Sequence, residues 1–142
     1  MRGLFVDTSG WCACADENDP AYASALRARD AWLKDGGQLV TTDYVLAESF
    51  TLIRKRLGLE ATEDWWRHVD ATPRLHWEWI GMERAAKARE LFFRYNDKDF
   101  SFVDCTSFVV MKELKLKDAL TTDSHFAQMG FQVHPPLSKA AK

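Results

Sequence analysis

Short apolar runs alternate with longer amphipathic segments along this chain, and the alternation limits the folds that it can adopt. The first apolar run is Leu4-Phe5-Val6, and comparable runs occupy 38–41, 75–80, 119–122 and 131–133. Segments with helical periodicity begin near Asp19, Thr42, Thr62, Glu83, Ser101 and Ser124. Because strands that alternate with helices form βαβ crossovers, we expect an α/β fold with a mainly parallel central sheet and helices on both faces.

The chain suits one compact domain that spans residues 1–142, because 142 residues can bury most of the surface that the unfolded chain exposes. Hydrophobic residues make up 46% of the chain and six are Trp, so the core has ample material and disorder is excluded for most of it. Pro135-Pro136 ends the last apolar run, and we expect residues from about 136 to 142 to form a flexible tail.

The composition predicts a cytoplasmic protein with no membrane contact. No stretch approaches the roughly 20 apolar residues of a membrane span, and only a short apolar run precedes Asp7. Cys12, Cys14 and Cys105 are an odd number without a disulfide framework, which fits a reducing compartment. The four His residues do not combine with these cysteines at any zinc-site spacing, so we interpret the cysteines as small buried or half-exposed thiols.

The net charge of -2 is not the electrostatic footprint of a protein that coats nucleic acid. Basic residues nevertheless gather locally in three groups, at 54–56, at 84–89 and at 112–117. Each group is either an ordinary solvated helix face or a contact for a polyanion, and the sequence leaves both interpretations open.

Four acids stand where apolar neighbours make a carboxylate costly to bury: Asp7, Glu48, Asp104 and Asp123. Two of them directly follow predicted strands, and the other two lie in the first turns of helices that begin near the same sheet edge. Open α/β sheets bind ligands at the carboxyl ends of their strands, so we expect the four acids to share one site. Carboxylates without a Cys or His cluster favour Mg²⁺ or Mn²⁺.

Each acid also has a simpler explanation. Asp7 and Asp123 fit turn residues or helix caps, and Asp104 stands three residues after Ser101, as in a capping box. Glu48 shares a helix face with apolar residues, so a salt bridge to an arginine is its main structural alternative.

Three motifs carry a resemblance to a known family: Val6-Asp7-Thr8-Ser9, the segment 100–105 that contains Asp104, and the segment 120–126 that contains Asp123. Together with Glu48 they resemble PIN-domain nucleases, particularly the VapC-type toxins, over essentially the whole chain. The resemblance implies a PIN-like three-layer α/β/α sandwich.

The resemblance also implies roles for individual residues. It implies that Asp7, Glu48, Asp104 and Asp123 form a catalytic cluster that holds magnesium or manganese, with Asp7 and Asp104 as the direct metal ligands. Thr8 and Ser9 occupy the hydroxyl positions that follow the first acid and could orient Asp7 or a bound water. Asp99 is a further nearby acid to which the resemblance gives no role.

The predicted activity is cleavage of RNA phosphodiesters to leave a 5'-phosphate and a 3'-hydroxyl, because a metal-activated water needs no 2'-hydroxyl. The resemblance implies a toxin that pairs as a homodimer and is inhibited by a small antitoxin protein. A non-toxin RNA-processing nuclease and a non-catalytic module that binds RNA or protein remain as alternatives. An aspartyl phosphotransferase would place a second acid two residues after Asp7, where this chain has Ser9, and a cysteine nucleophile lacks an evident base.

Overall fold

The computed structural model describes residues 1–137, and its strands form one five-stranded sheet in the order β3-β2-β1-β4-β5. The strands are β1 (Gly3–Val6), β2 (Gln38–Thr42), β3 (Leu75–Glu78), β4 (Asp118–Leu120) and β5 (Gln132–His134). All four pairings are parallel. The chain builds outward from β1 to β3 and then returns to the other side of β1 for β4 and β5. The strand order therefore reverses between β1 and β4, and this reversal creates a crevice at the carboxyl ends of these two strands.

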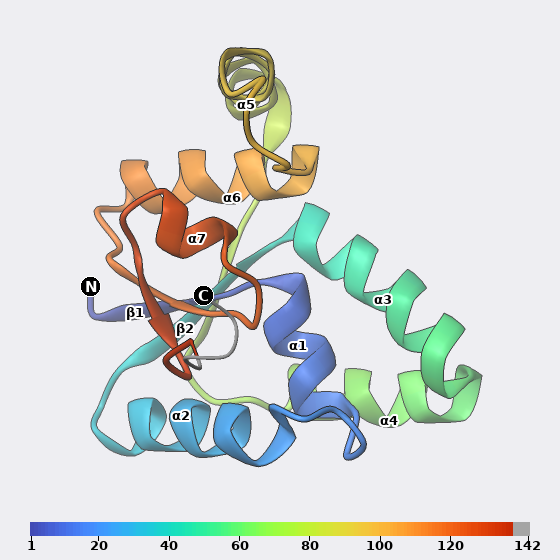
Figure 1. Ribbon diagram of the computed structural model, residues 1–142. Helices are drawn as coiled ribbons and strands as arrows, with labels where there is room; N and C mark the ends of the chain where they lie inside the picture. The colour runs from blue at the N-terminus through green and yellow to red at the C-terminus, as the bar shows by residue number, and fades with distance from the viewer. Residues whose placement is uncertain (138–142) are drawn as a thin grey trace.

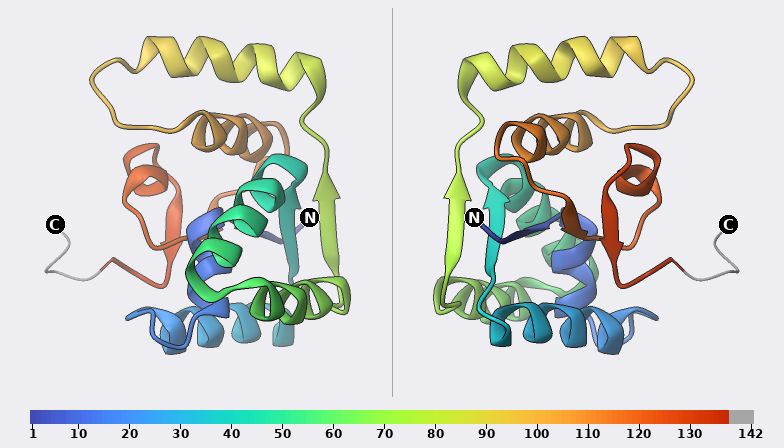
Figure 2. Two further views of the ribbon diagram at one scale, coloured as in Figure 1. Left: turned by 90° about the vertical axis from the view of Figure 1, so that its right-hand side faces the viewer. Right: turned by 90° about the vertical axis from the view of Figure 1, so that its left-hand side faces the viewer.

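Helices cover both faces of the sheet. They are α1 (Thr8–Ala15), α2 (Tyr22–Lys34), α3 (Asp43–Leu57), α4 (Leu59–Asp70), α5 (Gly81–Arg94), α6 (Phe102–Glu113) and α7 (His125–Gln128). Figure 1 shows α2 and α4 on one side of the strands and α6 on the other, and Figure 2 shows α5 lying outside α6. The predicted three-layer α/β/α sandwich with a parallel central sheet is confirmed.

The central strand β1 is buried on both faces, which explains why its apolar residues are continuous rather than alternating. Leu4, Phe5 and Val6 have no exposed surface. The ring of Phe5 stacks on Phe126 from α7, and Phe126 packs edge-on against Phe108 from α6. The carboxyl end of β1 is thus held in a rigid aromatic core, which fixes the position of Asp7 directly after it.

Most of the predicted elements are present, and several boundaries are wrong. The helix expected to begin at Thr62 begins at Leu59, and Thr62 lies inside it, where its hydroxyl donates a hydrogen bond to the carbonyl of Gly58. Gly58 is the only residue between α3 and α4, and its φ is 92°. This one residue therefore makes the whole connection between the two helices. The strands expected over 75–80 and 119–122 each end two residues early, at Glu78 and Leu120. Contrary to expectation, Asp123 therefore does not directly follow a strand but lies in the loop after β4.

Helix α1 is an element that the periodicity did not predict. Its sequence, Thr8 to Ala15, is apolar or small on every side and therefore carries no amphipathic signal. Gly10 lies so close to β4 that an added Cβ would be 2.2 Å from the carbonyl oxygen of Leu120. Burial between the sheet and its neighbouring helices, rather than intrinsic propensity, therefore stabilises this helix.

Two further expectations concern the carboxyl-terminal tail and the absence of a membrane-spanning segment. Residues 136 and 137 lie outside the helices and strands, and residues 138–142 of the predicted tail lie outside the described residues. Within residues 1–137, no helix combines the length and apolar character needed to cross a membrane.

Candidate metal centre

A cleft of about 390 Å³ opens at the carboxyl ends of β1 and β4, where the strand order reverses. Its lining residues are Asp7, Thr8, Ser9, Cys12, Asp19, Glu48, Leu52, Arg56, Ser101, Asp104, Thr122, Asp123 and His125. All four acids singled out from the sequence are among them. Residues separated by more than a hundred positions are thus brought into one cleft, and their catalytic roles stay predictions.

Asp7 is the most deeply buried of the acids, with 2% of its surface exposed. Its Oδ2 accepts hydrogen bonds from the hydroxyls of Ser9, at 3.0 Å, and Thr121, at 3.1 Å. Burial raises the pKa of Asp7 to about 7, and the charges of Asp123 and Asp104 add to this rise. Asp7 occupies the N-cap position of α1 but makes no side-chain cap bond, so the capping alternative does not account for it.

Ser9 fixes the orientation of Asp7 relative to the segment after β4. Besides its bond to Asp7, the Ser9 hydroxyl lies 2.9 Å from the hydroxyl of Thr121 and accepts a hydrogen bond from the backbone N–H of Thr122. A side chain from α1 is therefore tied to the loop that carries Asp123, which couples the two sides of the cleft.

Asp104 is 5% exposed and has two structural functions at once. It completes a capping box with Ser101, since its Oδ2 accepts from the Ser101 backbone N–H at 3.0 Å and its own N–H donates to the Ser101 hydroxyl. The same Oδ2 lies 2.7 Å from Nδ1 of His125. Burial raises the pKa of Asp104, and the Ser101 N–H opposes that rise. The capping box is real, yet it leaves Oδ1 without a hydrogen-bond partner among residues 1–137.

The other two acids are less buried. Asp123 lies in the loop between β4 and α7, where its Oδ1 accepts a hydrogen bond from the His125 backbone N–H at 2.9 Å. This contact is the turn-type interaction that the sequence allowed. Glu48 lies half-buried on α3, and within the described part of the chain it makes no ion pair with an arginine. The salt-bridge explanation for Glu48 is therefore not supported.

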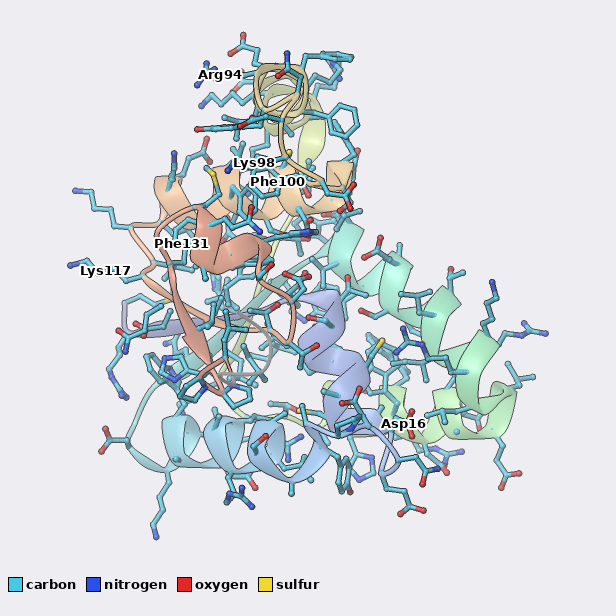
Figure 3. All side chains as sticks on the ribbon, viewed as in Figure 1. Asp16, Arg94, Lys98, Phe100, Lys117 and Phe131 are labelled. Carbon is cyan, nitrogen blue, oxygen red and sulfur yellow. The ribbon has the colours of Figure 1, made fainter. Side chains whose placement is uncertain are left out.

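His125 is a cleft residue to which the sequence argument gave no role, although it lies in the motif over 120–126. We assign a proton to its Nδ1, because an ionised carboxylate can only accept, so His125 donates to Asp104. The ring of Phe100 packs edge-on against the imidazole at 5.5 Å, and Figure 3 shows Phe100 beside α6. The sequence signal for His125 was its position, two residues after Asp123 and at the start of a short predicted helix. His125, at the start of α7, thus holds Asp104 of α6 in place.

The residues of the cleft fit a divalent metal ion. Oxygen or nitrogen atoms of Asp104, Asp123 and His125 lie within 4.8 Å of one another. The hydroxyl of Thr8 is buried in the same cleft and has no hydrogen-bond partner within residues 1–137. Carboxylates that raise one another's pKa, beside an unsatisfied hydroxyl, form an oxygen-rich environment that a hard cation would stabilise.

The cysteines and Asp99 do not belong to this oxygen-rich cluster, although Cys12 lines the cleft. Burial raises the pKa of the Cys12, Cys14 and Cys105 thiols to about 11, so they are protonated at neutral pH and are poor nucleophiles and metal ligands. Asp99 is exposed and does not line the cleft.

Comparison with known proteins identifies the family. A profile of the PIN domain matches residues 4–132, which is nearly the whole chain. The chain belongs to the PIN-domain family. This PIN domain is 31% identical over 137 residues to the 23S rRNA-specific endonuclease VapC20 of Mycobacterium tuberculosis, covering 93% of this chain and 98% of VapC20.

Solved structures agree with this assignment. The crystal structure of M. tuberculosis VapC20, described as a sarcin-ricin loop cleaving toxin, superimposes with a TM-score of 0.82 and 29% identity over 93% of this chain and 99% of that one. VapBC2 from Rickettsia felis, bound to a DNA fragment from its promoter, has a TM-score of 0.68, 14% identity and coverages of 92% and 96%. FitAcB from Neisseria gonorrhoeae has a TM-score of 0.63 and 13% identity, and the match covers 92% of this chain and 95% of that one. The predicted resemblance to VapC-type PIN domains is confirmed.

Proposed function

We propose that this PIN domain is a Mg²⁺- or Mn²⁺-dependent endoribonuclease whose metal is held by Asp7 and Asp104, with Glu48 and Asp123 completing the catalytic cluster. The observation that carries the proposal is the convergence of these acids on one cleft, with the carboxyl group of Asp7 buried beside others that raise its pKa. Such a cluster is unfavourable by itself and becomes favourable around a divalent cation.

The protein's own contribution is to hold the carboxylates in fixed orientations. Ser9 and Thr121 engage one oxygen of Asp7, while Ser101 and His125 engage one oxygen of Asp104. The Oδ1 atom of Asp104 accepts no hydrogen bond within residues 1–137 and is free to bind a cation. A divalent ion held by these carboxylates would supply an activated water for attack on the phosphodiester, and a second ion would stabilise the leaving oxygen. The products of this reaction carry a 5'-phosphate and a 3'-hydroxyl.

We propose 23S ribosomal RNA, cut in the sarcin-ricin loop, as the substrate. The support is the similarity to VapC20, which spans nearly all of both chains. Similarity to VapC20, which is described as a toxin, supports a role as the toxin of a toxin-antitoxin pair, and we propose that a small antitoxin inhibits it. We also propose that the protein forms a homodimer and that it is located in the cytoplasm, where ribosomes are found.

Incubation of intact ribosomes with the purified protein and Mg²⁺ or Mn²⁺ tests the proposal. Mapping of 5'-phosphate RNA ends should give one new end within the sarcin-ricin loop. Asp104→Asn should abolish this end, because it removes a charged oxygen from the cluster. Asp99→Asn removes the same charge from an exposed acid outside the cleft and should cleave like the wild type.

The alternatives predict other results. Cleavage at many sites or at another RNA, without growth inhibition on expression, would favour an RNA-processing nuclease. RNA binding without any cleavage, in either metal, would favour a non-catalytic binding module.

A further inference from the structure

A single strongly basic side chain faces the acidic cleft. Arg54, Lys55 and Arg56 are consecutive in the last turn of α3, yet Arg56 is the one Lys or Arg that lines this cleft within the described residues. Arg54 instead lines a separate hollow beside Phe50 and Trp66. Arg56 is exposed and has no ion-pair partner in residues 1–137. Its positive charge is therefore available to a ligand.

The register of two helices extends the cleft from the acids to Arg56. Glu48, Leu52 and Arg56 are spaced four residues apart on α3, so they share one helix face. Thr8 and Cys12 have the same spacing on α1, which packs against α3 as Figure 1 shows. With a rise of 1.5 Å per residue, Arg56 lies about 12 Å along the helix axis from Glu48.

The charge of Arg56 acts inside this groove. Burial raises the pKa of the Cys12 thiol, and the nearby guanidinium of Arg56 opposes that rise. Cys12 is one helical turn beyond Thr8, on the side of α1 that lines the cleft. Arg56 and Cys12 therefore line the same groove, from α3 and from α1.

We propose that Arg56 binds a phosphate of the RNA strand that flanks the scissile bond, and so positions the strand in the groove between α1 and α3. The inference rests on the proposed ribonuclease function. A polyanion that enters a cleft lined by Asp7, Glu48 and other acids needs a cation beyond the catalytic metal. A guanidinium offers two parallel N–H donors to a phosphate. Its separation of about 12 Å from Glu48 along the helix places Arg56 beyond the reacting phosphate, which makes it a binding residue outside the chemical step.

The test compares Arg56→Gln with Lys55→Gln, which removes the same charge from the adjacent exposed residue that does not line the cleft. Cleavage of a sarcin-ricin loop hairpin RNA gives KM and kcat. Binding of the same hairpin, and of an unrelated RNA of equal length, is measured in an Asp7→Asn background at several salt concentrations. Thermal unfolding checks that each variant is folded.

Arg56→Gln should raise KM and weaken RNA binding about threefold to tenfold, with kcat changed less than twofold. The loss should be similar for both RNAs, because phosphate contacts carry no sequence information. The slope of log K against log salt should become shallower by about 0.7, the contribution of one phosphate contact on a single strand. Lys55→Gln should change none of these quantities by a comparable amount.

Equal effects of the two variants, or no effect of Arg56→Gln on KM and binding, would overturn the role of Arg56 while the wild type still cleaves. If the wild type neither cleaves nor binds RNA, the proposed function fails, and the role of Arg56 fails with it. A loss confined to kcat would place Arg56 in the chemical step and would also contradict the inference.

Discussion

In the metal-free protein, Asp7→Asn should raise the free energy of unfolding at neutral and higher pH. Burial and the charges of Asp123 and Asp104 raise the pKa of Asp7 from 3.8 to about 7. Each pKa unit corresponds to about 1.4 kcal/mol, so ionising Asp7 in the folded state costs up to about 4 kcal/mol. Asparagine has no charge, and its amide oxygen still accepts from Ser9 and Thr121. We expect a gain of about 2 to 4 kcal/mol above pH 7.

The gain should depend on pH with a definite sign. Between the unfolded pKa and the folded pKa of Asp7, the folded state binds a proton that the unfolded state has lost. The stability of the wild type therefore falls as pH rises through this window, and Asp7→Asn lacks this contribution to the fall. At about pH 4 and below, where both states are protonated, the two proteins should differ little.

Urea unfolding in EDTA at about pH 5 and about pH 8 measures both effects. Asp99→Asn is the matched control, since it removes a charge from an exposed acid and should leave stability nearly unchanged. Added Mg²⁺ or Mn²⁺ should stabilise the wild type and not Asp7→Asn. A variant less stable than the wild type at pH 8 in EDTA would refute the reasoning, because it would mean that the hydroxyl donors alone stabilise the ionised Asp7.

Three further variants test the site and its support. His125→Ala removes the hydrogen-bond donor to Asp104, so it should weaken Mn²⁺ binding about 10- to 100-fold in calorimetry. His134→Ala is the control: His134 also pairs with an aspartate but does not line the cleft, so this variant should bind Mn²⁺ like the wild type. Thr8→Val removes a buried hydroxyl without a partner, so it should raise metal-free stability by about 1 kcal/mol and weaken Mn²⁺ binding. Gly10→Ala should lower the free energy of unfolding by about 3 kcal/mol or more, because its Cβ would overlap the Leu120 carbonyl.

The sheet and most helices follow from local patterns that the sequence displays. Thr42 accepts a hydrogen bond from the Val45 N–H at the start of α3, and Ser101 caps α6, both as their positions predict. Helix α1 could not be predicted in this way, because it is buried on most sides and has no polar face. Its stability comes from contacts with β4 and α3 that only the folded chain supplies.

The convergence of the four acids on one cleft was predictable, because a carboxylate among apolar residues needs an explanation. His125 and Arg56 were less evident, since each is an ordinary polar residue until the fold brings it to the cleft. The capping box shows why local rules did not decide the role of Asp104. One carboxylate satisfies a helix end with one oxygen and leaves the other for the cleft.

Cleavage of the sarcin-ricin loop hairpin, followed by analysis of the product ends, tests the central claim most directly. In Mg²⁺ or Mn²⁺ the products should carry a 5'-phosphate and a 3'-hydroxyl, and EDTA or Asp104→Asn should abolish them. Cleavage that persists in EDTA, or products that end in a 2',3'-cyclic phosphate, would contradict a metal-dependent site built from these four acids.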